Sequence, residues 1–257
     1  REVWQTIESG ARPELADLAA RVGQRVEVRL RAAALHVGDL LAACAPRSSA
    51  VTALFEAEVR SVLEDLAGIV SGCGFLATPD LFPDSALSHT WWTIESGTVE
   101  IARLDLDESS ESFYDYTSKD FFRLPTTTGQ MVVTGPYVDY LGTDGYILTW
   151  AVPVFLSGTV VGTVGADVTL QDLQLQLLAM GSSTPEPQAL VNSRGRVIFS
   201  TVSKPESGSM VRSSDLTAWF KGGTRPPVRN DEMQVWPCAG LPWAALVLIE
   251  QGRREAR

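Results

Sequence analysis

Apolar residues repeat at helical spacing through the first part of the chain. Pro13 suits the first turn of a helix, and apolar side chains then recur at steps of three or four, or their sum, at Leu15, Leu18, Val22, Val26, Ala33, Val37 and Leu40. This pattern predicts one long amphipathic helix that ends near Pro46. A second stripe of the same spacing from Val51 to Ile69 predicts another helix, which stops near the glycines at 72 and 74.

The pattern then changes to short runs of β-branched and aromatic residues separated by Gly, Pro, Asp and Ser. Strands are predicted at 74–77, 90–94, 99–104, 131–134, 146–155 and 159–168. Turn residues at 143–145 and 157–158 have the chemistry of hairpins. We expect a helix over 170–178 whose N-terminus is capped by Thr169, and a Gly, Ser and Pro linker at 181–187.

A smaller set of elements follows the linker. Strands are predicted at 189–192, 197–200, 233–237 and 243–249, with a helix over 214–221. The fold class is therefore α+β: a long N-terminal helix followed by two lobes with antiparallel sheets. The expected domains are an N-terminal helical region (1–70), a larger first lobe (71–180) and a smaller second lobe (181–257).

Charge and composition exclude several classes of function. The net charge of −10 and the presence of only three lysines argue against nucleic-acid binding, which depends on clustered Lys and Arg. The longest apolar runs, at 147–156 and 243–249, are far shorter than the roughly 20 residues that cross a bilayer, so the sequence as given is expected to be soluble. A membrane partner is expected only if flanking segments exist outside this sequence.

The metal-ligating residues are few and scattered. Three widely separated cysteines without a C-x-x-C pair indicate neither a disulfide framework nor a zinc site. Buried free thiols are expected, with one disulfide and one free thiol as the alternative. His36 and His89 are too few for a three-histidine metal site. We expect no metal and no cofactor.

Three segments carry a family resemblance. They are Gly135-Pro136-Tyr137-Val138-Asp139, Thr149-Trp150-Ala151-Val152-Pro153-Val154 and Gly162-Thr163-Val164-Gly165-Ala166-Asp167-Val168. In order and spacing they resemble the conserved segments of double Cache domains, also called PDC sensor domains, which are the ligand-binding domains of bacterial chemoreceptors and sensor kinases. The resemblance implies two PAS-like lobes, with the ligand held in the first.

The resemblance also implies a set of binding residues. Tyr114 matches the first tyrosine of the amino-acid-binding pattern, and Tyr137, Asp139 and Asp167 match its last three positions. The chain departs from the pattern between them: Lys119 replaces the carboxylate-binding arginine, Phe121 the tryptophan and Phe122 the second tyrosine. A shifted alignment would use Arg123 as the arginine but would disturb the aromatic spacing.

The chemistry of these residues suits a ligand that carries an ammonium group. Asp139 and Asp167 would accept its hydrogen bonds, and the aromatic rings would enclose its apolar part. Lys119 offers a point charge to a carboxylate but not the bidentate fork of arginine, so we expect an amine or an ω-amino acid more than an ordinary α-amino acid. The structural alternatives remain open: the aspartates as caps of backbone amides, Phe121 and Phe122 as core aromatics at the end of a short helix, and Lys119 as a solvated side chain.

The sequence thus predicts a sensor that binds a small molecule and passes on a conformational change, and not an enzyme. The alternatives are a small-molecule hydrolase or lyase that uses Asp139 and Asp167 as acid and base, and a dimerising scaffold built on the long helix. A homodimer through that helix is also compatible with sensing. The location is open between the extracytoplasmic part of a membrane receptor and a stand-alone soluble bacterial protein.

Overall fold

The computed structural model describes residues 4–8, 12–44, 47–95, 97–138, 145–180, 186–222 and 225–249. Contacts divide the chain into two compact units: Arg25–Asp172, and a second unit that joins Arg1–Gln24 to Leu173–Arg257. The three segments expected from the sequence follow chain order, whereas the contacts group the beginning of the chain with its end. The first boundary falls inside the long helix.

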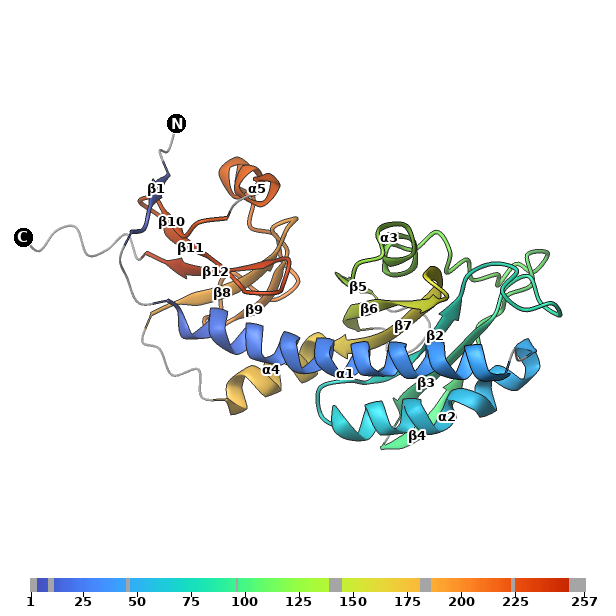
Figure 1. The fold of residues 1–257 in the computed structure, drawn as a ribbon. Helices are drawn as coiled ribbons and strands as arrows, with labels where there is room; N and C mark the ends of the chain where they lie inside the picture. Colours follow the sequence, from blue (N-terminus) through green and yellow to red (C-terminus); the bar gives the residue numbers. More distant parts are fainter. Residues whose placement is uncertain are drawn as a thin grey trace, which may run out of the picture. The chain divides into compact units, whose positions relative to one another are not determined.

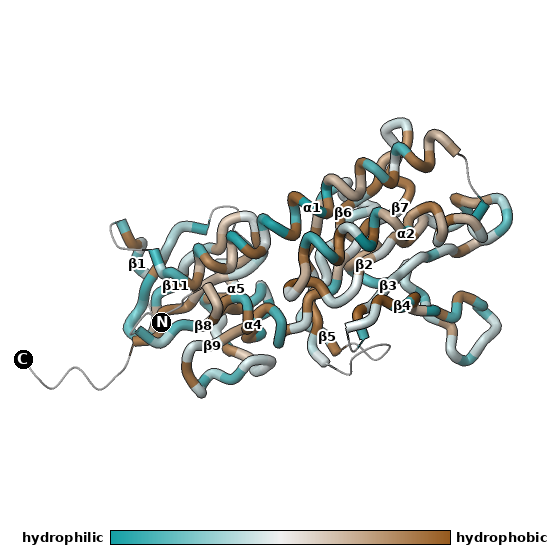
Figure 2. The backbone as a smooth tube through the Cα atoms, turned by 90° about the horizontal axis from the view of Figure 1, so that it is seen from below, coloured by the Kyte–Doolittle hydropathy of each residue, from teal (hydrophilic) through white to brown (hydrophobic). Residues whose placement is uncertain are grey.

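Two helices form the first layer of the Arg25–Asp172 unit (Figure 1). Helix α1 covers Glu14–Cys44 and helix α2 covers Ser48–Asp65. The apolar stripe of α1 is buried, with Val22, Val26 and Val37 no more than 2% exposed. Hydrophobic and hydrophilic residues alternate along this helix in Figure 2. Both predicted helices are confirmed, and amphipathic periodicity is the physical reason. The end of α2 differs from the prediction, because the helix stops at Asp65 and not near Gly72.

The sheet of this unit has six antiparallel strands in the order β4-β3-β2-β7-β6-β5. The strands are β2 (Gly72–Ala77), β3 (His89–Glu95), β4 (Thr98–Ala102), β5 (Val132–Val138), β6 (Tyr146–Leu156) and β7 (Thr159–Thr169). The β6–β7 hairpin turns through Ser157 and Gly158, both with positive φ (50° and 83°), as a two-residue type I′ turn requires. The predicted turn at 157–158 is therefore confirmed, whereas residues 143 and 144 of the other predicted turn lie outside the described residues.

The two faces of this sheet carry different side chains, because successive residues of a strand point to opposite sides. Phe75, Trp92 and Trp150 lie on the face covered by α1 and α2 and are at most 1% exposed. The ring of Phe75 meets that of Phe55 from α2 edge to face, with the ring centroids 5.3 Å apart. A third helix, α3 (Asp120–Thr128), lies over the other face.

The second unit is built on its own antiparallel sheet, in the order β1-β10-β11-β12-β8-β9. Its elements are β1 (Gln5–Thr6), β8 (Gln188–Asn192), β9 (Val197–Ser200), β10 (Val228–Arg229), β11 (Met233–Pro237), β12 (Trp243–Leu248) and the helix α5 (Ser214–Lys221). The core contains Val191, Leu216, Val235 and Leu246, each at most 1% exposed. Helix α4 (Leu170–Ala179) follows β7 directly, and Thr169 Oγ1 accepts a hydrogen bond from the Asp172 amide at 2.9 Å, as predicted for its cap.

The α+β fold with two antiparallel sheets is confirmed, and several local expectations are corrected. Phe121 and Phe122 lie at the start of α3, because the helix begins at Asp120 and ends before Gly129, which has a φ of 65°. Strand β5 extends past Thr134 to Val138. Cys44 is exposed at the end of α1, whereas Cys73 and Cys238 are the buried free thiols expected. The two-residue strands β1 and β10 were not predicted, because they are too short to show a period.

No helix within the described part of the chain is long and apolar enough to cross a membrane.

Candidate functional site

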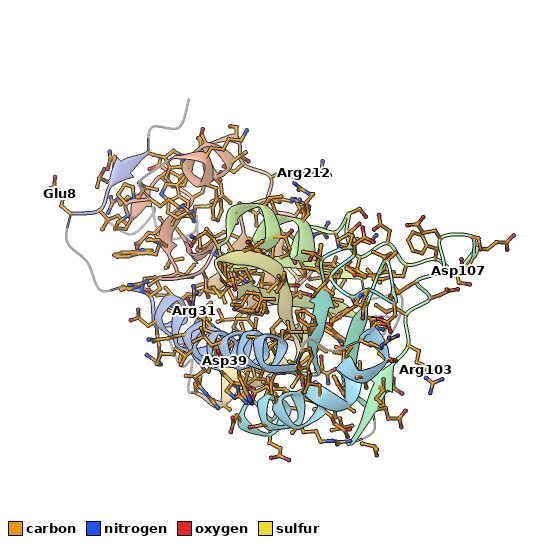
Figure 3. All side chains as sticks on the ribbon, turned by 45° about the vertical axis from the view of Figure 1, so that its right-hand side comes forward. Glu8, Arg31, Asp39, Arg103, Asp107 and Arg212 are labelled. Atoms are coloured by element: carbon orange, nitrogen blue, oxygen red, sulfur yellow. The ribbon has the colours of Figure 1, made fainter. Side chains whose placement is uncertain are left out.

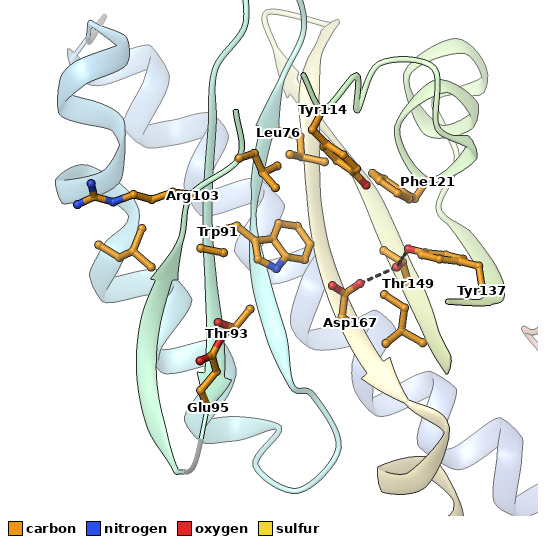
Figure 4. A pocket seen from close by; sticks show the side chains of 14 residues that line it. Leu76, Trp91, Thr93, Glu95, Arg103, Tyr114, Phe121, Tyr137, Thr149 and Asp167 are labelled. Carbon is orange, nitrogen blue, oxygen red and sulfur yellow. Dashed lines mark hydrogen bonds between the residues drawn. The ribbon is translucent and has the colours of Figure 1, made fainter. Parts of the chain in front are cut away.

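A cavity of about 320 Å³ opens on the sheet face opposite α1 and α2 (Figure 4). This volume is near the lower end of the range of roughly 300–1,000 Å³ that is usual for small-molecule sites. The lining residues come from all six strands, α3 and the segment between β4 and α3: Leu76, Trp91, Thr93, Glu95, Ile101, Ala102, Arg103, Leu104, Tyr114, Phe121, Tyr137, Ile147, Thr149 and Asp167. The cavity therefore belongs to a single unit and suits a small ligand.

A chain of hydrogen bonds crosses one side of the cavity. Thr149 on β6 and Asp167 on β7 are directly opposite in the strand register and share a face. Thr149 Oγ1 donates to Asp167 Oδ1 at 2.5 Å, and the Tyr137 hydroxyl bonds to the same Thr149 oxygen. Because threonine has one hydroxyl proton, which goes to the carboxylate, Tyr137 must be the donor to Thr149. Two hydroxyls thus orient and support the carboxylate at the cavity.

A β-bulge brings Tyr137 to this face. The register of β5 against β6 shifts between Thr134 and Tyr137, so that Tyr137 pairs with Ile147 while Thr134 pairs with Thr149. Gly135 has a φ of 103°, and a Cβ atom there would lie 2.6 Å from the carbonyl oxygen of Ile147. Only glycine fits this position, which explains the glycine of the Gly-Pro-Tyr sequence noted above.

Trp91 from β3 lies against three glycines of the neighbouring strands. A Cβ atom at Gly72 would be 3.0 Å from the indole Nε1, one at Gly74 would be 2.8 Å from Cε3, and one at Gly165 would be 3.0 Å from Cη2. In the register, Gly74 pairs with both Trp91 and Gly165, so these positions share the cavity face. Because glycine has no side chain, these three positions leave a flat strip of backbone on which the indole rests. Figure 4 shows the ring between Leu76 and Asp167.

Three further rings form the other side of the cavity. The rings of Phe121 on α3 and Tyr137 on β5 are nearly parallel, with an angle of 26° and centroids 6.2 Å apart. Tyr114 comes from the segment before α3, and the exposed Lys119 places its Nζ 5.5 Å from the centroid of the Tyr114 ring. The cavity is thus flanked by aromatic rings from β3, β5, α3 and the segment that precedes α3.

The segment that carries Tyr114 is held by a buried tyrosine. Tyr116 is fully buried, and its hydroxyl donates to the Ala77 carbonyl of β2 at 2.8 Å. Burial raises the pKa of Tyr116 to about 12. The ring of Phe122 packs edge to face against Tyr116, with centroids 5.0 Å apart. Phe122 is only 4% exposed and is not among the residues that line the cavity.

His89 ties the β4 side of the cavity to β3. Its Nε2 accepts a hydrogen bond from the Leu104 amide at 3.2 Å, and burial lowers the pKa of the imidazole. An imidazole that accepts through Nε2 is neutral. This bond positions Leu104, one of the lining residues.

The charges around the cavity are mostly negative. Asp167 and Glu95 contribute carboxylates, and among the described lining residues Arg103 has the one positive charge. The Arg103 side chain is exposed and extends outward, away from Asp167 (Figures 3 and 4). Arg123 is bonded to Asp120 at 2.7 Å and does not line the cavity. Over the described residues, no group of His, Cys, Asp and Glu side chains could hold a metal ion.

The structure brings together Tyr114, Phe121, Tyr137 and Asp167 of the residues singled out from the sequence. Lys119 lies beside Tyr114 on its exposed side, Phe122 lies in the core, and Asp139 falls outside the described residues. Sequence reasoning missed Trp91, Thr93 and Thr149. The sequence signal that could have identified Trp91 was the Gly-x-Gly spacing at 72 and 74 on the neighbouring strand. Glycine within a strand often marks a place where another group approaches the backbone closely.

Comparisons with known proteins agree on the kind of domain. Residues 89–175 match a family model described as "Methyl-accepting chemotaxis protein-like, first PDC sensor domain". No curated protein sequence matches the chain significantly. Residues 89–175 are therefore similar to the first PDC sensor domain of chemotaxis proteins, and the described residues of the chain have the double PDC, or double Cache, fold.

Several solved structures share this fold at low sequence identity. The extracellular domain of a candidate histidine kinase, mmHK1S-Z3, has a TM-score of 0.66 and 16% identity, covering 92% of this chain and 90% of that one. "Methyl-accepting Chemotaxis protein X" has a TM-score of 0.59 and 16% identity, covering 90% and 91%. The ligand-binding domain of the Campylobacter jejuni chemoreceptor Tlp3 in complex with L-valine has a TM-score of 0.57 and 16% identity, covering 92% and 91%.

Proposed function

We propose that this chain is a ligand-sensing domain that binds a small amine or amino acid in the cavity of the Arg25–Asp172 unit. The observation that carries the proposal is the Asp167 carboxylate, supported by Thr149 and Tyr137 and surrounded by aromatic rings. A carboxylate accepts strong hydrogen bonds from an ammonium group, and aromatic faces attract cations. The Tlp3 structures with isoleucine and L-valine bound show that this fold holds amino acids in another protein.

Tyr114, Phe121, Tyr137 and Asp167 are the proposed ligand contacts, and Asp139, which follows Val138 of β5, is proposed as the second carboxylate. Phe122 would support the site through Tyr116. Among the described residues, the cations that lie at or beside the cavity and could meet a carboxylate of the ligand are Lys119 and Arg103, both of which are exposed. This arrangement favours an amine or an ω-amino acid, whose carboxylate is far from its ammonium group, over an α-amino acid.

The route from the cavity to the second unit is short in the chain. Asp167 is three residues before Leu170, where α4 begins, and the division between the units falls at Asp172–Leu173. The Asp167 carbonyl also accepts hydrogen bonds from the Ser71 amide at 2.8 Å and from the Ser71 hydroxyl at 3.2 Å, in the segment after α2. A ligand that favours one conformation of β7 would therefore shift α4 and α2. Such a shift is the coupling that a sensor needs.

A thermal-shift screen tests the proposal, with amines, ω-amino acids, α-amino acids, polyamines and small carboxylates as probes. We expect amine-containing compounds to raise the melting temperature, because a ligand that binds only the folded state stabilises it. Asp167→Asn should lower the affinity about 10- to 100-fold, in line with the roughly 1.5–3 kcal/mol of a charged hydrogen bond. Asp107→Asn, which changes an exposed aspartate outside the cavity, is the matched control and should bind normally.

The absence of any shift, or a shift with carboxylates alone, would contradict the proposal. Recovery of the bound compound unchanged after long incubation, by mass spectrometry, separates a binding domain from a hydrolase or lyase. Conversion of the compound that disappears in Asp167→Asn would establish an enzyme instead.

A further inference from the structure

The N-terminus of α2 is capped by a residue from a distant segment. Arg47, the residue before the helix, has an extended backbone and no side-chain hydrogen bond to the first turn. Asp84 supplies an acceptor instead, because its Oδ1 accepts a hydrogen bond from the Ser48 amide at 2.8 Å. This bond holds the pKa of Asp84 below its ordinary value. A helix N-terminus has free amide groups and a partial positive charge, so Asp84 helps to fix the position at which α2 begins.

Asp84 lies in the central turn of the connection between β2 and β3, which we call the 78–88 segment. The Asp80 amide donates a hydrogen bond to the Ala86 carbonyl across this segment at 2.8 Å. The Phe82 side chain is buried, at 4% exposure. A short connection that is bonded internally and packed by its own side chains moves as a unit. A displacement at the base of the 78–88 segment therefore reaches Asp84.

Tyr116 holds both ends of the 78–88 segment. Its hydroxyl donates to the Ala77 carbonyl at 2.8 Å and accepts a hydrogen bond from the Ser88 amide at 3.3 Å. The two ends are also joined to each other, because the Ala77 amide donates to the Ser88 carbonyl at 3.0 Å. Tyr116 belongs to the segment between β4 and α3, which also carries the cavity residue Tyr114. One buried hydroxyl thus joins a cavity-lining segment to the base of the 78–88 segment.

We propose that the 78–88 segment transmits movement from the cavity to α2, with Tyr116 at its base and Asp84 at its contact with the helix. A shift of the segment between β4 and α3 displaces Tyr116. The 78–88 segment follows as a unit, and the start of α2 follows through the bond between Asp84 and Ser48. The inference goes beyond the proposed function, because it concerns any ligand that moves the segment between β4 and α3.

The proposed route ends at the pair of helices on the far face of the sheet. Arg29 of α1 bonds to Glu58 of α2 at 2.7 Å and to Asp65 at the end of α2 at 2.6 Å, so a movement of α2 also reaches α1. The long helix contributes residues to both units of the chain. This route is separate from the path through β7 and α4, and it starts at the opposite side of the cavity lining.

Hydrogen–deuterium exchange of the whole chain, followed by mass spectrometry, tests the proposal without a ligand. Amides exchange when their hydrogen bonds open, so the rate reports local stability. Asp84→Ala removes the acceptor of the Ser48 amide, and we expect amides at 48–55 to exchange about 5-fold faster. Asp84→Asn keeps an acceptor oxygen in the same place and should stay within about 2-fold of the unmodified chain. Exchange at 188–192, in strand β8 of the other unit, is the internal reference.

Tyr116→Phe changes the other end of the route. It removes the hydroxyl that holds the 78–88 segment, and we expect exchange at 48–55 to rise about 3-fold. In the double variant with Asp84→Ala, the rise at 48–55 should equal that of Asp84→Ala alone, because both changes break one route. Tyr146→Phe makes the same chemical change at an exposed tyrosine and should leave 48–55 unaltered.

Coupling is reciprocal, which supplies a second measurement in a variant that should fold. Asp84 is exposed, and Asp84→Ala should raise exchange at 114–122, at the far end of the route, by at least about 2-fold. No change there would overturn the proposal, even if Tyr116→Phe does not fold.

Two results with Tyr116→Phe would also overturn it. One is faster exchange confined to 78–88 and 103–119, with 48–55 unchanged. The other is additive rises at 48–55 in the double variant, since additive changes act independently. The measurement uses no bound compound, so its failure leaves the proposed function standing. Failure of every compound in the thermal-shift screen would refute the proposed function and leave the coupling in place.

Discussion

The two faces of the β4-β3-β2-β7-β6-β5 sheet are made by the same strands and have opposite properties. On β6, Trp150 is fully buried toward the helices, while the preceding residue, Thr149, directs its hydroxyl to the cavity carboxylate. On β7, Ala166 is fully buried, while Asp167 is partly exposed at the cavity. On β2, Phe75 packs against α2, while Gly74 makes room for Trp91.

This contrast divides the sheet into a face that stabilises the fold and a face that we propose binds the ligand. The helix side buries large apolar side chains, which is the main source of folding free energy. The cavity side combines aromatic rings with glycine, threonine and aspartate, which contribute little burial but leave space and polar groups for a ligand. Because side chains alternate along a strand, the division is made residue by residue.

The largest expected effect is on the helix side. Trp150→Ala removes a fully buried indole, and we expect a loss of about 3–5 kcal/mol in the free energy of unfolding. Urea denaturation followed by circular dichroism measures the change. The folded fraction should bind ligand with nearly unchanged affinity. A large fall in affinity in the folded protein would show that the two faces are not separable.

Thr149→Val is the matched change on the cavity side, one residue away. It keeps the side-chain shape but removes the hydroxyl that joins Tyr137 to Asp167. We expect a loss of about 10-fold in ligand affinity by calorimetry, and a change of no more than about 1 kcal/mol in stability. A variant that is strongly destabilised but binds normally would reverse the roles assigned to the two faces.

A smaller effect is expected in the helix layer itself. Glu58 on α2 accepts a hydrogen bond from Arg29 of α1 at 2.7 Å and pairs with His36 Nδ1 at 2.5 Å. Burial alone would raise the pKa of Glu58, but the hydrogen bonds from His36 and Arg29 outweigh it, so the pKa is lowered. Arg29 also bonds to Asp65 at 2.6 Å and would keep that partner in Glu58→Gln. We expect this variant to lose about 1–2 kcal/mol at pH 7.

The sign of the pH dependence follows from the lowered pKa. The carboxylate stabilises the fold fully above its ordinary pKa of 4.5, and the stabilisation is lost as the pH falls through the lower value of the folded state. The stability difference between the unmodified chain and Glu58→Gln should therefore shrink below about pH 4.5. Ligand affinity at pH 7 should not change. A difference that stays constant down to pH 3 would mean that the ion pair does not contribute.

The sequence by itself determined the elements with a strong period. The apolar stripes at 15–40 and 51–69 gave both long helices, and the turn at Ser157 and Gly158 gave the central hairpin. The resemblance to double Cache domains also implied that Tyr137 and Asp167 share a cavity, and both line it. The helices and the hairpin follow from local pattern, which each segment shows without its neighbours.

Other features depended on contacts between distant segments. Trp91 and Thr149 became cavity residues through strand register, which pairs Gly74 with both Trp91 and Gly165 and pairs Thr149 with Asp167. Phe121 and Phe122 are neighbours in sequence, yet only Phe121 lines the cavity, because Phe122 turns toward Tyr116 on the adjacent side of α3. Period and motif are local properties of a chain, whereas a cavity forms only where register and packing bring separate strands to one face.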